Sequence, residues 1–124
     1  MQYELTQRFF FEAAHTLERK VDAEPSRRIH GHTYFAEVAV RGAPQADTGM
    51  VMDLGHLRRA IDPVRDALDH RLLDEVEGLT RPTLEGLCSY IASALSDSVP
   101  QLAWVRVWRE ASGDTCTLTL RAPA

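Results

Sequence analysis

The sequence has little cysteine and no long apolar run, and both shortages narrow the class of protein. Its only cysteines are Cys88 and Cys116. Two are too few for a disulfide scaffold and indicate a reducing compartment, so we expect a cytoplasmic protein. No stretch approaches the roughly 20 apolar residues of a membrane helix. The segment from Met1 to Arg8 lacks the basic start and apolar stretch of a signal peptide.

Charge, apolar content and length exclude further classes. The formal net charge of −4 argues against a general nucleic-acid binder. Hydrophobic residues make up 44% of the chain, which is too many for a disordered protein. A chain of 124 residues has room for one core, because two would each bury too little surface. We therefore expect residues 1–124 to form a single domain, with neither a membrane nor a nucleic acid as partner.

Two segments near the N-terminus have the pattern of β-strands. Residues 3–13 alternate between apolar and polar side chains, which predicts a strand with one buried face. Residues 32–41 return to β character and end before Gly42. The polar stretch between them, 17–28, contains Pro25 and is typical of a loop.

The middle of the chain has the residue spacing of α-helices. Apolar residues recur three and four positions apart and share one helix face: Leu54, Leu57, Ile61, Val64 and Leu68. Asp53 is well placed as the N-cap of this helix, and Pro63 should kink it. A second helix is predicted from Thr83 or Leu84 to about Ser96.

The C-terminal part predicts two more strands, over residues 102–110 and 115–121, with turn residues between them. The order is then β-β-α-α-β-β, an α+β domain with two helices packed on one face of an antiparallel sheet. Aromatic residues on both strand faces suggest that other subunits cover edges or faces of that sheet.

Three histidines could form a metal site. His30 and His32 are two residues apart, so a strand would place both on one face, and Gly31 allows close backbone approach. His15 ends the first predicted strand, the expected antiparallel neighbour. Three neutral imidazoles with an open fourth position are typical of catalytic zinc. The alternative is that the histidines are ordinary polar groups.

Two further positions offer candidate catalytic or ligand-binding residues. Asp69 precedes His70 after the first predicted helix, and a carboxylate that orients an imidazole makes a general acid or base. The alternative is a histidine at a helix C-terminus beside a solvated carboxylate. Glu110 ends an apolar strand, where a buried carboxylate could accept two N–H donors from a heterocycle. The alternative there is an exposed carboxylate at the strand end, paired with Arg109 or with another neighbour.

Six short motifs follow one another between residue 3 and about residue 120. They are Phe10-Phe11-Glu12-Ala13-Ala14-His15, His30-Gly31-His32, Gly49-Met50-Val51-Met52-Asp53, Leu68-Asp69-His70, Pro82-Thr83-Leu84-Glu85 and Glu110. In this order the motifs resemble the 6-pyruvoyl-tetrahydropterin synthase / 6-carboxytetrahydropterin synthase family.

The resemblance implies a fold, an assembly and a metal. The fold is the tunnelling fold (T-fold), whose β-β-α-α-β-β subunits form trimers that stack into hexamers, with sites between subunits. The metal is zinc on His15, His30 and His32. The substrate is 7,8-dihydroneopterin triphosphate or a related pterin, whose side-chain hydroxyls bind the zinc.

The resemblance also implies roles for other residues. Asp69 and His70 match the family's acid/base pair. Glu110 matches the glutamate that anchors the pyrimidine edge of the pterin, with Thr83 and Glu85 lining the same pocket.

The chain departs from the family beside the His-Gly-His motif. Ser26 stands four residues before His30, where family synthases carry a catalytic cysteine, and a serine hydroxyl is a poorer base than a thiol of pKa ~8.5. Arg27 stands where a side-chain-cleaving branch of the family has a glutamate. Arg27 and Arg28 could hold a triphosphate bidentately, or be solvated loop charges.

The resemblance implies a zinc-dependent lyase of the 6-carboxytetrahydropterin synthase type, and in bacteria it suggests a step toward queuosine and 7-deazapurine synthesis. The alternative is a pterin-binding homologue with little or no synthase activity, because Ser26 replaces the catalytic cysteine. An RNA or protein binder built on the same fold is disfavoured by the acidic charge balance.

Overall fold

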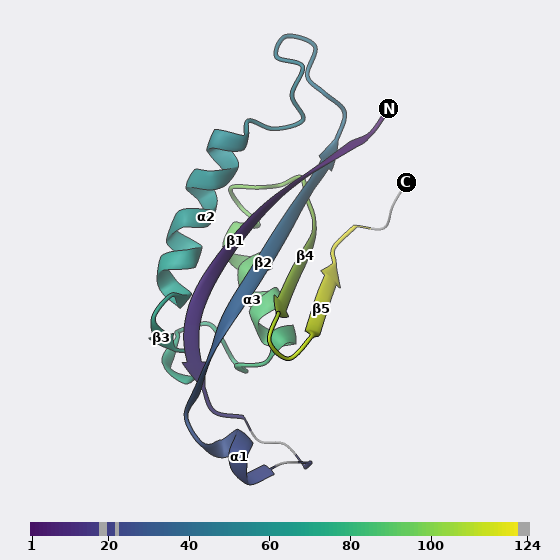
Figure 1. Cartoon of the computed structure of the whole chain (residues 1–124). Helices are drawn as coiled ribbons and strands as arrows, with labels where there is room; N and C mark the ends of the chain where they lie inside the picture. Colours follow the sequence, from purple (N-terminus) through teal and green to yellow (C-terminus); the bar gives the residue numbers. More distant parts are fainter. Residues whose placement is uncertain (18–19, 22, 122–124) are drawn as a thin grey trace.

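A computed structural model describes residues 1–17, 20–21 and 23–121, in which helices cover one face of a sheet (Figure 1). The strands are β1 (Tyr3–His15), β2 (His30–Gly42), β3 (Arg71–Leu72), β4 (Leu102–Arg109) and β5 (Asp114–Thr119). The helices are α1 (Ala23–Arg27), α2 (Leu54–Leu68) and α3 (Leu84–Leu95), with a 3₁₀ turn η1 (Leu73–Glu75). None of the described helices is long and apolar enough to cross a bilayer.

The strand order in the sheet is β3-β1-β2-β4-β5. β1 and β2 pair antiparallel along their whole length, from Tyr3 opposite Gly42 to His15 opposite His30. β4 pairs antiparallel with β2 and with β5. The sequence predicted an antiparallel sheet. The short β3 runs parallel to β1, so the sheet is mixed.

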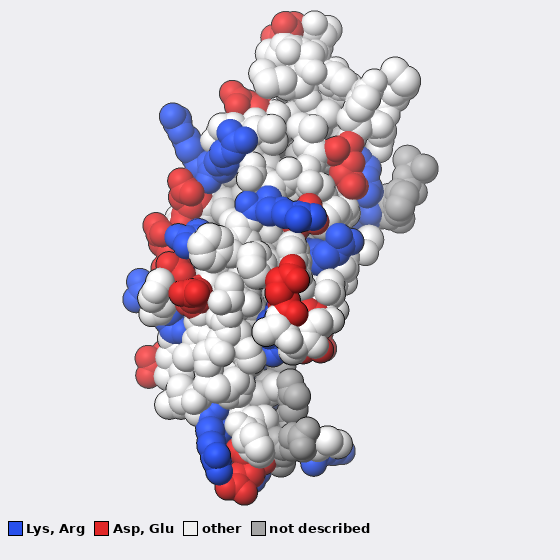
Figure 2. Space-filling model, in the orientation of Figure 1, with Lys and Arg blue, Asp and Glu red and all other residues white. Residues whose placement is uncertain are grey.

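The two faces of the sheet differ in what covers them. On the covered face, Phe11 and Tyr34 stack with ring centroids 5.2 Å apart and are fully buried. The apolar sides of α2 and α3 complete this core. On the open face, Phe35 and Trp108 stack 5.8 Å apart, and Phe10 beside them is 49% exposed. Basic and acidic side chains are interspersed on the surface in Figure 2.

Most of the predicted elements are present. α2 spans the predicted 54–68, with the Asp53 carboxylate accepting a hydrogen bond from Gly55 N at 2.8 Å, and it continues through Pro63 as one helix. The predicted loop 17–28 is wrong in part, because it contains α1. β1 and β2 are both longer than predicted, since their pairing continues to the histidines.

Candidate metal centre and its surroundings

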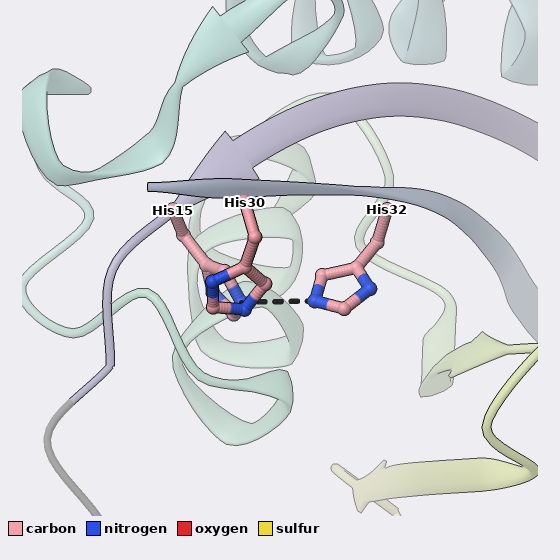
Figure 3. Close-up of side chains that lie close together, drawn as sticks. All are labelled: His15, His30 and His32. Carbon is pink, nitrogen blue, oxygen red and sulfur yellow. Dashed lines mark hydrogen bonds between the residues drawn. The ribbon is translucent and has the colours of Figure 1, made fainter. Parts of the chain in front are cut away.

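Three histidines meet at the end of the β1–β2 pair on the covered face. His15 lies opposite His30 in the register, and Ala13 lies opposite His32, so all three side chains leave the strands on one side. Figure 3 shows the three rings turned toward one another. Nε2 of His15 lies 2.9 Å from Nε2 of His30 and 3.1 Å from Nε2 of His32. The possible ligand atoms of the three residues all lie within 4.8 Å of one another.

Backbone carbonyls fix the orientation of two of the rings. Nδ1 of His15 lies 2.7 Å from the Pro82 carbonyl, and Nδ1 of His30 lies 2.7 Å from the Arg28 carbonyl. Because a carbonyl only accepts, each Nδ1 carries the hydrogen and each Nε2 presents a lone pair. Lone pairs this close repel unless a cation lies among them.

The donor set therefore fits a metal ion. Tetrahedral zinc with Zn–N bonds of about 2.0–2.1 Å spaces its nitrogens by roughly 3.4 Å. The distances from Nε2 of His15 to Nε2 of His30 and of His32, 2.9 and 3.1 Å, are close to this value. Burial lowers the pKa of His15 below its ordinary value of 6.5, and this outweighs the opposite effect of the Pro82 carbonyl. His15 is thereby held in the neutral form that a metal requires. The neighbouring Tyr34 hydroxyl stays protonated, because burial raises its pKa to about 12.

A hollow of about 400 Å³ opens beside the histidines. It is lined by Pro25, Ser26, His30, His32, Arg109, Ser112 and Asp114. Ser26, on α1, is 7% exposed and forms part of this wall. The structure thus brings Ser26 into the same hollow as His30 and His32.

Asp69 and His70 form a hydrogen-bonded pair directly after α2. Oδ2 of Asp69 lies 2.9 Å from Nδ1 of His70, and its Oδ1 accepts from Glu12 N at 3.0 Å. The bond from Glu12 N is the main reason, ahead of His70, that the pKa of the Asp69 carboxyl lies below its usual value. His70 adopts a left-handed backbone (φ 57°) and its side chain is 76% exposed.

This pair opens toward the other face of the sheet. Nε2 of His70 lies 4.0 Å from a carboxylate oxygen of Glu12, which pairs in the register with Thr33. Thr33 follows His32 in β2, so its side chain points to the opposite face. A hollow of about 540 Å³ beside His70 has His32 in its wall, yet the His32 imidazole meets His15 on the covered face. Within one chain the pair and the converging Nε2 atoms face different ways.

The three residues expected in a pterin pocket do not share a hollow within one chain. The Thr83 hydroxyl accepts from Gly86 N at 3.0 Å as the N-cap of α3. Thr83 and Glu85 line a hollow of about 690 Å³ beside α3. Glu110 instead accepts a hydrogen bond from Trp108 Nε1 at 2.9 Å, on the open face.

The arginines of α1 and its exit are exposed. Arg28 pairs with Glu24 at 3.0 Å, one helical turn earlier, and Arg27 also faces solvent. Neither cysteine is at the histidine cluster: the Cys88 thiol donates to the Cys116 carbonyl at 3.5 Å inside the core. Burial is the main cause that raises the pKa of Cys88 to about 12, so this thiol stays protonated.

The sequence predictions missed Arg109. It is 8% exposed and shares the hollow with Ser26 and two of the histidines. Its signal was present in the sequence, since it continues the inward alternation of Val105 and Val107 in β4.

A sheet covered on one side by helices, with three converging imidazoles at its end, defines an α+β domain with a candidate metal centre. The family model described as 6-pyruvoyl tetrahydropterin synthase matches residues 4–121. The chain therefore belongs to the 6-pyruvoyl tetrahydropterin synthase family, which confirms the resemblance carried by the six motifs.

Individual relatives agree with this assignment. The chain is 37% identical over 119 residues to a 6-carboxy-5,6,7,8-tetrahydropterin synthase of Synechocystis, covering 91% of this chain and 87% of the relative. It is 33% identical over 100 residues to a dihydroneopterin monophosphate aldolase of Pyrococcus furiosus, covering 81% of each. The solved 6-pyruvoyl tetrahydropterin synthase of Caenorhabditis elegans matches with a TM-score of 0.82 at 26% identity, over 96% of both chains. The predicted T-fold is thus confirmed.

Proposed function

We propose that this protein converts the side chain of 7,8-dihydroneopterin triphosphate or a related pterin in a zinc-dependent reaction. The reaction type would be that of a 6-carboxytetrahydropterin synthase-like lyase, on the route to queuosine and other 7-deazapurines. The observation that carries the proposal is the convergence of three Nε2 atoms in a chain whose relatives bear these names. The unpaired state of Cys88 and Cys116 supports a cytoplasmic location.

His15, His30 and His32 would hold the zinc ion. When bound, zinc supplies Lewis acidity toward the hydroxyl groups of the pterin side chain. The Pro82 and Arg28 carbonyls support this role by keeping two ligand rings in the required orientation.

Asp69 and His70 would move the proton. The Asp69 carboxylate orients the His70 ring through Nδ1, which leaves Nε2 to take a proton from a carbon of the side chain and return it. Asp69 stays ionised for this task, since its pKa is lowered. Ser26 lines the hollow beside the ligands and would stand in place of the family thiol as a much weaker base.

A complete site would then need a second copy of the chain. His70 opens toward the open face, whereas the Nε2 atoms meet on the covered face. Packing of two copies would let one contribute the metal and the other the acid/base pair. We therefore propose a homo-oligomer, a trimer or hexamer, with its sites between subunits.

The remaining pterin contacts belong to the same proposal. The exposed Glu110 carboxylate would accept the N–H donors of the pyrimidine edge, releasing Trp108. Thr83 and Glu85 would line the pocket from the start of α3. Arg27 and Arg28 are placed in solvent, where they could reach a triphosphate.

Ser26 favours a second function, that of a pterin-binding homologue with little or no synthase activity. A hydroxyl occupies the wall where the family has a thiol, and a hydroxyl is not ionised at neutral pH. The pocket and metal would be kept while turnover is lost.

Two measurements test these functions. Metal analysis of the purified protein should find about one zinc per chain, lost in His32→Ala and kept in the control His56→Ala. The absence of zinc would contradict both functions. Turnover of 7,8-dihydroneopterin triphosphate by the wild type supports the lyase. An inert wild type whose Ser26→Cys variant gains activity supports the binding homologue.

A further inference from the structure

We propose that the hollow beside the histidines binds a carboxylate group of the ligand, held between the metal and the Arg109 guanidinium. This inference rests on the proposed function in one respect, namely that the three histidines bind a metal ion. The ligand group is a new assignment. It makes Arg109 a binding residue of this site.

The first observation is an unsatisfied donor. Arg109 is 8% exposed, and within the described part of the chain its buried Nε has no hydrogen-bond partner. A buried N–H without an acceptor costs free energy that a ligand can recover by supplying one. Arg109 is among the residues that line the hollow.

The second observation is how the guanidinium is held. Its Nη2 donates to Asp114 Oδ2 at 2.8 Å, and the Ser112 hydroxyl donates to the same oxygen at 2.8 Å. The Asp114 side chain is 48% exposed, whereas that of Arg109 is 9% exposed. The Asp114 carboxylate therefore holds the guanidinium on the solvent side of the Arg109 side chain.

The third observation is the nearness of the metal ligands. His30 and His32, two of the proposed metal ligands, line the same hollow as Arg109. The Asp114 carboxylate balances the charge of Arg109. A divalent cation on three neutral imidazoles would then leave the hollow with an excess of positive charge, which attracts an anion. A carboxylate fits best, because its two oxygens can divide between the cation and the planar guanidinium.

The hollow beside the metal does not suit the amidine edge of a pterin. The amidine edge of a pterin donates N–H groups, and Arg109 has only donors to offer. The Glu110 carboxylate can accept those donors, but it lies on the open face, where it accepts a hydrogen bond from Trp108. Around the metal, therefore, the chain presents a carboxylate-binding wall rather than an amidine-binding one.

A matched pair of small probes tests the inference on zinc-loaded protein. Lactate and propane-1,2-diol share a skeleton and a hydroxyl, and only lactate has a carboxylate. We expect lactate to bind roughly 10- to 100-fold more tightly than the diol, as measured by ligand-observed NMR titration. Arg109→Gln should abolish this preference, and Arg109→Lys should keep part of it. Arg106→Gln is the control. Arg106 lies in the same strand but on the open face, so this substitution should leave the preference for lactate unchanged.

The zinc content and thermal unfolding of each variant are measured beside the affinities, so that loss of the fold is not mistaken for loss of the contact. If Arg109→Gln does not fold, Arg109→Lys carries the test. Equal binding of lactate and diol by the wild type would overturn the inference, as would an unchanged preference in Arg109→Lys and Arg109→Gln. Tighter binding of inorganic phosphate than of lactate would also overturn it, since the site would then be a phosphate site.

A second pair separates this inference from the proposed function. Pterin-6-carboxylate should bind more tightly than 6-hydroxymethylpterin, with the same dependence on Arg109. If neither pterin binds while lactate still distinguishes wild type from Arg109→Gln, the proposed function fails and the carboxylate site stands. If both pterins bind equally in all variants, the carboxylate site fails and the pterin function stands.

Discussion

Nε2 of His15 and Nε2 of His30 lie 2.9 Å apart, and the two residues are direct partners in the register of β1 and β2. A metal ion bound to both would join the ends of the two longest strands. The segment that connects these strands, including α1, would then be closed at its base by the ion.

Zinc should therefore stabilise the fold. A ligand that binds only the folded chain adds about 2.7 kcal/mol at a concentration 100 times its Kd, which for a chain of this size raises Tm by roughly 10 °C. Differential scanning calorimetry with zinc and after chelation measures this shift. His30→Ala should abolish the shift and His56→Ala should keep it, because His56 contacts the Ser98 carbonyl far from the cluster in sequence. An equal shift in His30→Ala would contradict the site.

Acid should destabilise the metal-free protein in the pH range of histidine. Burial lowers the pKa of folded His15 below 6.5, so the unfolded chain binds more protons between these two values. Stability is thus complete above about pH 6.5 and is lost as the pH falls toward the pKa of the folded state. Urea unfolding between pH 7 and pH 5 measures this slope. His15→Gln should flatten it, and a slope unchanged by that substitution would refute the assignment to His15.

Asp69→Asn should impair catalysis more than binding. The substitution removes the carboxylate that orients His70, so we expect kcat to fall by roughly 10²- to 10⁴-fold with little change in KM. The kcat of His70→Ala should fall by a similar factor. Asp66→Asn, an exposed neighbour on α2, is the control and should retain activity. A KM effect of the same size as the kcat effect would point to a binding role instead.

Mixing two inactive variants should restore activity if sites lie between subunits. His32→Ala lacks the metal ligand, and His70→Ala lacks the acid/base group. When dissociated and reassembled at equal amounts, about a quarter of the sites should combine an intact copy of each, if subunits assemble at random. Activity after reassembly measures this fraction. Complete inactivity of the mixture, with oligomers formed normally, would place each site within one chain.

The elements that could be predicted are those fixed by periodicity. The alternation in residues 3–13 determines which side chains of β1 are buried, and the three-and-four spacing from Leu54 to Leu68 determines α2 to the residue. The proximity of His15 to the His-Gly-His motif follows from pairing two such strands. These signals are local or nearly so, which is why a single sequence contains them.

What could not be predicted depends on contacts distant in sequence. The parallel strand β3 forms because His70 N donates to the Glu12 carbonyl at 2.6 Å, a bond that no local pattern encodes. The left-handed backbone of His70 then directs its side chain away from the histidine cluster. For Glu110 the sequence left a buried and an exposed carboxylate open. Its neighbour Arg109 continues the inward alternation of β4, and Glu110 is exposed.

The alternation of β2 has a consequence for how this chain can vary in length. His32 and Thr33 are neighbours whose side chains serve opposite faces, and Tyr34 follows in the core. An insertion or deletion of one residue in the middle of β2 would carry both strand histidines to the open face while the downstream valines stayed buried. A substitution in this strand changes one side chain, whereas a change in residue number moves every side chain on one side of it to the other face. Length differences should therefore be confined to its flanks: the α1 segment before it, and residues 43–50 after it.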